Sequence, residues 1–538
     1  MLHQKFIESA RRNSNKIAIN DLATNKDYTY GKLLIASLIL KNKFLKYHGT
    51  YLGLLLPTSA GCHLSVIATL MAGKIPVMIN YATGAIRNCE YARDKCGFEH
   101  IITSRGLLKK LKLEPLPEMI FLEDIMSELT IWDKLPSALF SKLPASLIKL
   151  SVHAGKPDDT SVILFTSGSE KEPKAVQLSH KNIEHQIKIL PGMVAADSKD
   201  VFAGALPLFH IFGLTITFWV PLLTGASVVT FPNPLDYRFI CENVRKYKVT
   251  GMVGTSTFFS GYLRKSKPGD FETVRFGISG GDKLPEKLRL AYKGDHGVTL
   301  YEGYGATETS PVISGNSIFH YRPGSIGKPI IGAKVKIIDV ETDRDLPAGE
   351  IGKILCKGDF VMTGYLGDYE ETLLHMHNGW YDTGDMGCFD DDGFLWHKGR
   401  LKRFVKIGGE MVSLVRVEDV ITRLLPEEIQ CCVVELPHPV KGAEIAVAIS
   451  TDNYNKLKLS LQLKLELPAI ALPKRFYVLE EMPLSGTGKI DFREVKNICG
   501  RLRLEQKENK EDLKSRFNSL VHKKPEKKIS EEDNSLDC

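Results

Sequence analysis

The stretch SVILFTSGSEKEPK, residues 161–174, says most about the fold of this chain. An apolar run ends at Phe165 and passes into a loop of hydroxyl side chains, glycine and lysine. This order is typical of a buried strand followed by an anion-binding turn, where N–H groups, hydroxyls and an ammonium group converge on a phosphate. The loop lacks the GxxxxGK[ST] spacing, which argues against a P-loop NTPase.

Short apolar runs at 51–56, 227–231 and 250–253 alternate with longer helical patterns such as 285–292. This alternation predicts α/β units with mainly parallel sheets. From about 323 the strands become closely spaced and separated by glycines, which favours a small barrel or antiparallel sheet. A compact region of about 100 residues begins after Arg400.

We therefore predict an α/β protein of several subdomains. A large N-terminal body, 1–400, would hold two α/β subdomains and a β-barrel-like subdomain at about 323–399. A smaller α+β domain would follow at 401–500. Residues 501–538 contain 19 charged side chains in 38 and few large apolar ones, so we expect a short helix that frays into a disordered tail.

Composition excludes several classes of protein. The 538 residues are too many for one ordinary domain, and 43% hydrophobic with 25% charged residues fits neither a disordered nor a fibrous chain. The formal charge is +7, and residues 1–50 alone hold nine basic and three acidic side chains. That excess is either a solvated face or a landing surface for an acidic partner or an anionic membrane. No basic run is interleaved with aromatics, so we expect no nucleic acid partner.

Residues 211–231 run without a charge for about the length of a membrane span. Gly213, Pro221 and Gly225 interrupt the run, so we predict a buried helix and strand and no transmembrane segment. The ten cysteines are scattered without a CxxC pair, and the N-terminus lacks the apolar core of a signal peptide. These features predict a cytoplasmic protein with reduced thiols, with peripheral contact at the inner face of the membrane as an open alternative.

Four further motifs carry polar chemistry: YEGYGATET at 301–309, YDTGD at 381–385, GRLKRFVKIGGE at 399–410 and PLSGTGKI at 483–490. The carboxylate of Glu308 in a tight glycine turn suits Mg²⁺, which takes carboxylate and phosphate oxygens together. Tyr304 beside that turn can stack on a base. The carboxylate of Asp385 can accept hydrogen bonds from both hydroxyls of a ribose.

These five segments, in this order, resemble the adenylate-forming superfamily of acyl-CoA synthetases, luciferases and peptide-synthetase adenylation domains. The resemblance runs from about residue 27, at YTYG (28–31), to about residue 495. More narrowly, GRLKRFVKIGGEMVSL (399–414), TSGSE (166–170) and LPLFHIFGLT (206–215) resemble the acyl–acyl carrier protein synthetase part of 2-acylglycerophosphoethanolamine acyltransferases.

The resemblance implies an ATP- and Mg²⁺-dependent, AMP-forming ligase that makes an acyl-adenylate and passes the acyl group to a phosphopantetheine thiol. Glu308 would hold Mg²⁺, and Thr307 would contact the α-phosphate. The other implied nucleotide-binding residues are, for the pyrophosphate, Thr166, Ser167, Gly168, Ser169 and Lys174; for adenine, Ser279, Gly280, Gly281, Tyr304 and Gly305; and for the ribose, Asp385 and Arg400.

The resemblance also implies a mobile C-terminal lid. Lys489 would act in adenylation, and a rotation about a hinge at Lys402 would then bring Lys406 and the Gly408-Gly409 backbone to the active site. His210 would lie beside the acyl carboxylate, with a satisfied core histidine as the alternative role. Phe209, Phe212 and the following apolar run would line an acyl tunnel.

Two departures separate this chain from the family pattern, since Lys171 and Ala175 stand where the phosphate loop usually has glycine. The HxxxxD spacing of His153 and Asp158 is that of glycerolipid acyltransferases, but no separate acyltransferase domain precedes residue 28. We therefore predict a fatty acid:acyl carrier protein ligase, with acyl carrier protein as a partner. A long-chain fatty acid:CoA ligase and a nucleotide-binding relative without catalysis remain as alternatives.

Overall fold

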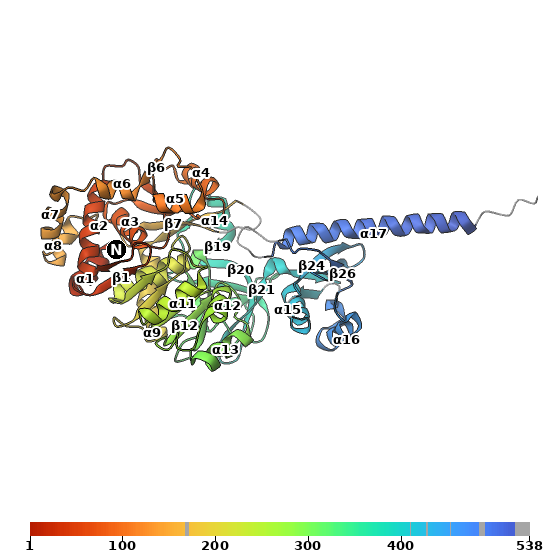
Figure 1. Ribbon diagram of the computed structural model, residues 1–538. Coiled ribbons are helices and arrows are strands. Elements are labelled where there is room, and N and C mark those ends of the chain that lie inside the picture. The colour runs from red at the N-terminus through yellow and green to blue at the C-terminus, as the bar shows by residue number, and fades with distance from the viewer. Residues whose placement is uncertain (167–171, 409, 427–428, 452, 484–489, 522–538) are drawn as a thin grey trace, which may run out of the picture. The chain divides into compact units, whose positions relative to one another are not determined.

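A computed structural model describes residues 1–166, 172–408, 410–426, 429–451, 453–483 and 490–521. The chain divides into two compact units, Met1–Leu401 and Lys402–Cys538 (Figure 1). Each unit has its own hydrophobic core, so each is described by itself.

The first sheet of unit 1 has seven strands, in the order β18-β8-β7-β4-β3-β5-β6. Strands β7, β4, β3, β5 and β6 are parallel. At one edge β8 pairs antiparallel with β7, and β18 pairs antiparallel with β8. The strand bounds are β3 Tyr51–Leu55, β4 Ile75–Met78, β5 Ile101–Thr103, β6 Met119–Phe121, β7 Thr160–Phe165, β8 Ala175–Ser179 and β18 Gly364–Tyr365. The helices of this half are α2 Tyr30–Phe44, α3 Ala60–Met71, α4 Ala85–Cys96, α5 Arg105–Leu111, α6 Leu122–Ser127, α7 Ile131–Phe140 and α8 Ala145–Leu150.

The second sheet has nine strands, in the order β15-β14-β13-β12-β11-β9-β10-β1-β2. Its six central strands are parallel, and β2, β14 and β15 are antiparallel additions at the edges. The bounds are β1 Ile17–Asp21, β2 Lys26–Thr29, β9 Val201–Gly204, β10 Ser227–Thr230, β11 Gly251–Gly254, β12 Phe276–Gly280, β13 Leu300–Gly305, β14 Val312–Gly315 and β15 Lys328–Pro329. The helices here are α1 Leu2–Arg12, α9 His180–Met193, α11 Tyr237–Lys246, α12 Ser256–Lys265 and α13 Glu286–His296.

The uncharged stretch 211–231 is buried inside unit 1, as the sequence predicts. It forms a π-helix, Gly213–Trp219, then α10, Val220–Thr224, and then β10. The π-helical turns were not expected; Pro221 has no N–H to donate to the carbonyl four residues earlier, and the change to α-helix falls at this point. No helix in the described part of the chain is both long and apolar enough to cross a bilayer.

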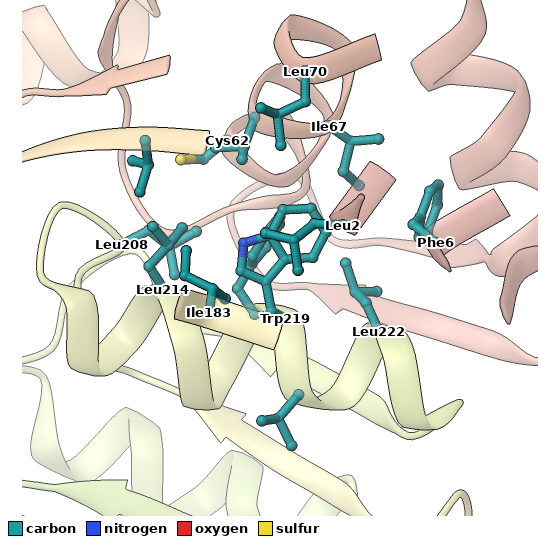
Figure 2. Packing of buried hydrophobic residues seen from close by; sticks show 14 of the residues in the cluster. Leu2, Phe6, Cys62, Ile67, Leu70, Ile183, Leu208, Leu214, Trp219 and Leu222 are labelled. Atoms are coloured by element: carbon teal, nitrogen blue, oxygen red, sulfur yellow. The ribbon is translucent and has the colours of Figure 1, made fainter. Parts of the chain in front are cut away.

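Trp219 lies at the centre of the largest core. Figure 2 shows its ring among Leu2 of α1, Ile67 of α3 and Leu214 of the π-helix, and the Trp219 side chain is 1% exposed. Its replacement by alanine would cost about 3–5 kcal/mol of unfolding free energy. This core holds the N-terminal helix and the segment after His210 in one body.

A five-stranded antiparallel sheet completes unit 1, in the order β16-β17-β20-β19 with β21 paired to β20. Its bounds are β16 Lys334–Ile338, β17 Gly352–Lys357, β19 Met376–His377, β20 Trp380–Phe389 and β21 Leu395–Arg400, with α14 Tyr369–His375 before β19. The predicted fold class, two α/β halves, a small β-rich sheet and a smaller C-terminal unit, is confirmed.

Unit 2 is an α+β unit that begins at Lys402, in a short 3-10 turn, Leu401–Arg403. Its elements are β22 Phe404–Ile407, β23 Glu410–Ser413, α15 Leu414–Leu424, β24 Cys431–His438, β25 Gly442–Ile449, α16 Lys456–Glu466, β26 Arg475–Val478 and α17 Phe492–Val521. The expectation of only a short helix in the tail is wrong, because α17 continues to Val521. Residues 501–521 contain neither glycine nor proline, so nothing in them ends a helix.

Candidate active site

Two turns of the nine-stranded sheet bring the predicted adenine-binding residues together. Strands β12 and β13 are parallel neighbours in which Ser279 pairs with Glu302 and Gly280 with Gly303. Their carboxyl ends therefore meet at one edge of the sheet, next to Tyr304. Gly281 has φ +83°, a conformation that favours glycine, and it turns the chain away at this edge. The Phe212 ring lies 3.2 Å from where a Cβ of Gly280 would stand, so the His210 segment reaches the same turn.

The glycine turn after β13 is shaped by close backbone approach. A Cβ on Gly305 would stand 1.7 Å from the carbonyl oxygen of Pro311, so no other residue fits there. Thr307 and Glu308 follow in a 3-10 turn, with Thr307 half-buried and Glu308 8% exposed. The hydroxyl of Tyr365 donates to Glu308 Oε1 over 2.8 Å.

We call Tyr304, Asp385, His397 and Arg400 the ribose corner. Asp385 on β20 is the register partner of Arg400 on β21. The Tyr304 hydroxyl donates to Asp385 Oδ2 over 2.6 Å, and His397 Nε2 is 3.6 Å from Oδ1. The pairing across two strands and the hydroxyl of Tyr304 hold the Asp385 carboxylate in place.

The electrostatics of the ribose corner keep Asp385 ionised. Burial alone would raise the pKa of Asp385, but interaction with His397 and the charge of Arg400 outweigh it and hold that pKa below its usual value. Asp385 in turn raises the pKa of Arg400. Burial, and then the neighbouring Asp385 charge, raise the pKa of Tyr304, so its hydroxyl stays a donor.

One oxygen of Asp385 is left for a ligand. Arg400 Nε lies 3.0 Å from Oδ1, but no donor among the described residues makes a hydrogen bond to this buried atom. This oxygen is compensated by the Arg400 charge but can still accept hydrogen bonds, and ribose hydroxyls are donors of the right kind. The corner therefore fits a nucleoside.

We call Lys174, Tyr365, Glu371 and His375 the lysine cluster. Lys174 Nζ forms an ion pair with Glu371 Oε1, lies 3.1 Å from His375 Nε2, and stands 4.8 Å from the Tyr365 ring centre. The lysine is fixed at its base as well, because the N–H groups of Thr166 and Lys174 bond across the loop to the Lys174 carbonyl and the Thr166 hydroxyl. Lys174 is thus held by an acid on α14.

Other predicted phosphate-loop residues, Ser167, Gly168, Ser169 and the unusual Lys171, lie outside the described residues. Ala175 is described, and it is the first residue of β8, paired with Phe165. The φ angle of Ala175 is not positive, so its backbone does not require the glycine that the family pattern has at this position.

His210 is an exposed residue between β9 and the π-helix. Its ring centre lies 4.5 Å from that of buried Phe209, and its carbonyl accepts from Leu214 N–H at the start of the π-helix. This position next to Phe212 agrees with a site role better than with a core histidine. His153, the histidine of the HxxxxD spacing, accepts a hydrogen bond at its main-chain carbonyl from the ring of buried His3.

The predicted residues of unit 2 are described by themselves. Lys402 lies in the 3-10 turn, and exposed Lys406 lies on β22, where it pairs in register with Met411 on β23. Gly408 has φ +57°, which favours glycine. Gly409 and Lys489 lie outside the described residues.

Sequence reasoning missed Tyr365, Glu371, His375 and His397, which bind the predicted residues. Glu371 and His375 are four apart on α14, with 3.3 Å between His375 Nε2 and Glu371 Oε1. That acid–histidine spacing was a readable signal on a helix. His397 precedes the GR of the third motif by only two residues, and its approach to Asp385 follows from the strand pairing.

The ligands for Mg²⁺ would have to come in part from the substrate. No group of three or more histidine, cysteine, aspartate or glutamate side chains in the described part of the chain could hold a metal ion. Glu308 fits as one carboxylate ligand, with phosphate oxygens supplying the rest, which is how Mg²⁺ is usually bound at nucleotides.

The fold is that of the adenylate-forming superfamily. The "AMP-binding enzyme" family profile matches residues 6–366, and the profile of its C-terminal domain matches residues 416–489. The chain belongs to the AMP-binding enzyme family.

Several known proteins are similar to this chain. A long-chain-fatty-acid–CoA ligase of Yersinia pestis is 29% identical, over 64% of this chain and 63% of that protein, so the match spans less than two thirds of its length. One from Haemophilus influenzae is 26% identical, over 84% of this chain and 86% of that protein. Among solved structures, ATP-bound MatB of Rhodopseudomonas palustris has a TM-score of 0.79 at 22% identity and covers 93% of this chain and 99% of its own. The o-succinylbenzoate CoA synthetase of Bacillus subtilis with its acyl-adenylate also has a TM-score of 0.79 at 22% identity, covering 92% and 98%. At this identity both structures support the fold alone.

Proposed function

We propose that this protein is an ATP-dependent, AMP-forming ligase that joins a fatty acid to a phosphopantetheine thiol. The observation that carries the proposal is the ribose corner, where a buried, ionised Asp385 keeps one oxygen for a nucleoside beside the adenine turn. Family membership supports the reaction type, and the similar long-chain-fatty-acid–CoA ligases support the acid substrate.

In the first step a carboxylate oxygen of the acid attacks the α-phosphorus of ATP, and the bond to pyrophosphate breaks. Negative charge collects on the α-phosphate and the leaving group, so cations that contact those oxygens lower the barrier. We assign the pyrophosphate to Thr166, Ser167, Gly168, Ser169 and Lys174, the α-phosphate to Thr307, and the attacking carboxylate to His210 and Lys489. Mg²⁺ held by Glu308 would neutralise phosphate charge.

In the second step the thiol sulfur attacks the acyl carbon, AMP leaves with the bonding electron pair, and the thiol proton passes to solvent or a base. Lys489 and an incoming thiol cannot occupy one place, so we propose that unit 2 turns about Lys402 between the steps. Lys406 and the backbone of Gly408 and Gly409 would then line the thiol path, where glycines allow close approach. The C-terminal family profile matches residues 416–489, a range that includes Lys489.

CoA is our first candidate for the thiol acceptor, because the similar ligases named above are CoA ligases. Acyl carrier protein is the second candidate. Two features favour it: the segment GRLKRFVKIGGEMVSL, and the basic excess of residues 1–50, since carrier proteins are acidic.

The test has two stages. The purified full chain should catalyse ATP–pyrophosphate exchange that depends on a long-chain fatty acid. Absence of exchange with every acid tried would contradict the ligase and favour the nucleotide-binding alternative. Supplying CoA or holo acyl carrier protein separately then identifies the acceptor. Formation of a thioester with carrier protein but not with CoA would contradict our choice of CoA as the first candidate.

Lys489→Ala separates the two steps. The variant should lose about 10²–10³ in exchange rate but still convert pre-formed acyl-AMP to thioester, because only adenylation needs the lysine. Lys474→Ala, a lysine on the loop before β26, is the matched control and should leave both steps unchanged. Equal loss of both steps in the Lys489 variant would contradict the assigned role.

A further inference from the structure

The segment 131–150 exposes an unusual amount of apolar surface. Seven large apolar side chains on α7, α8 and their connection are exposed, which no other 20 described residues match. We call them the α7–α8 surface: Ile131, Trp132, Leu135, Leu139, Leu143, Leu147 and Leu150. Trp132 is 80% exposed and Leu150 82%.

Helix α7 has its polarity reversed relative to an ordinary surface helix. Its buried residue is Ser137, whereas Ile131, Leu135 and Leu139, four apart on one face, point outward. Helix α8 buries only Ile148. Exposed apolar side chains that gather on one short segment in this way mark an interaction site.

The scaffold under this surface is fixed. Helix α7 packs on α2 and α8 packs on α1, at the edge of unit 1 (Figure 1). Asp133 binds Lys43 over 2.9 Å, Lys149 pairs with Glu8, and Arg11 donates to the Lys142 carbonyl over 2.9 Å. The outward side chains are therefore presented by an anchored element.

The segment that carries this surface and the N-terminal segment that includes the helices under it, α1 and α2, have an excess of basic side chains. Residues 1–50 and 131–150 together hold 12 basic and four acidic side chains, while the other 468 residues hold 59 basic and 60 acidic. The single acid of 131–150, Asp133, is already paired with Lys43. Lys134 and Lys142 are exposed among the apolar residues, and the nearby Asp124 is bonded to Arg105.

An apolar groove extends the surface onto α2. It has a volume of about 200 Å³ and is lined by Ile35, Ile39, Met126 and Leu129 together with Lys32 and Lys134. Apolar walls with two lysines suit an acyl chain that carries an anionic headgroup.

We propose that the α7–α8 surface docks this protein on an anionic phospholipid bilayer, with Trp132 and the leucines entering the headgroup–acyl boundary and the lysines facing lipid phosphates. Exposed leucines and tryptophan with flanking lysines are the composition that binds bilayer interfaces. The proposal does not depend on which thiol accepts the acyl group.

Vesicle flotation of the full chain tests this. The protein should float with vesicles of phosphatidylcholine and phosphatidylglycerol, bind phosphatidylcholine alone about tenfold or more weakly, and lose binding as salt rises. Trp132→Ser with Leu139→Ser, and separately Lys134→Glu with Lys142→Glu, should each weaken binding about tenfold or more. Trp132→Phe should keep binding but lose the blue shift of tryptophan emission.

Matched variants control for a general loss of apolar surface and for unfolding. Leu461→Ser with Leu465→Ser changes exposed leucines on α16 and should leave binding unchanged. Each variant should melt at the parent temperature, and exchange activity is measured in parallel. Failure to bind anionic vesicles, equal loss from the α16 pair, or a change of oligomeric mass in the Trp132 and Leu139 variant would overturn the proposal, the last because a second copy would then cover the surface.

Discussion

The ribose corner and the lysine cluster differ in how ready they are for a ligand. Both lie in unit 1, and both place a charged side chain against a partner of opposite charge. In the corner, Asp385 is fixed by Tyr304 and still has an oxygen without a donor. In the cluster, the Lys174 ammonium is already bound by Glu371 and His375. On the assignment proposed above, the nucleoside end would be preorganised, whereas the phosphate end would have to exchange a protein partner for an anion.

Removing the acid of the corner should give the largest effect. Asp385→Ala should lower kcat/KM for ATP in the exchange reaction by about 10²–10³, because hydrogen bonds to a charged acceptor are worth about 1.5–3 kcal/mol each. Asp392→Ala, an exposed acid on the same subdomain that pairs with Arg322, is the control and should change the rate little. A loss below threefold for Asp385→Ala would show that the corner does not bind the nucleoside.

Removing the lysine should come second. Lys174→Ala should lower kcat for exchange by about 10²-fold, since a cation that contacts the leaving pyrophosphate acts most in the transition state. The effect should be smaller on KM than on kcat in steady-state kinetics. Lys181→Ala, an exposed lysine at the start of α9 that pairs with Asp359, is the matched control. A purely KM effect would place Lys174 in ground-state binding instead.

Removing the Glu371 charge that binds Lys174 should have a small effect, and it should strengthen pyrophosphate binding. Glu371→Gln keeps the shape of the side chain but removes the charge that holds Lys174, so KM for pyrophosphate should fall about threefold. Glu370→Gln, the preceding exposed acid on α14, controls for the change in net charge. A large loss of activity in Glu371→Gln would mean that the acid positions the lysine for catalysis.

The smallest effect should be that of pH on the corner. The pKa of Asp385 lies below its usual value of about 3.9, so the carboxylate stays ionised throughout the neutral and mildly acid range. Its contribution to stability is present above the unfolded pKa and is lost as pH falls through the lower folded value. Adenosine affinity, measured by calorimetry, should therefore be flat from about pH 7 to 5. A fall within that range would contradict the ionised Asp385 carboxylate as the group that controls binding.

Local motifs predicted both partners of the main contacts in the ribose corner, but only one partner of the ion pair in the lysine cluster. Asp385, Arg400 and Tyr304 were found because each lies in a short glycine-containing motif, and strand pairing then brought them together. Lys174 was found in the same way, but Glu371 lies almost 200 residues further along the chain, and only the fold brings it there. The length of α17 was missed because composition was read as disorder, although its residues allow a helix.

The π-helix after His210 makes this part of the site sensitive to chain length. A π-turn takes in one residue more than an α-turn, so deleting one residue between 213 and 219 could restore α-helical bonding. If the hydrogen-bonding pattern stayed as it is, the deletion would instead rotate His210 and Phe212 by about 100° relative to Trp219, which the core holds in place. An insertion or deletion in this stretch would thus redirect the histidine without changing any residue that it touches.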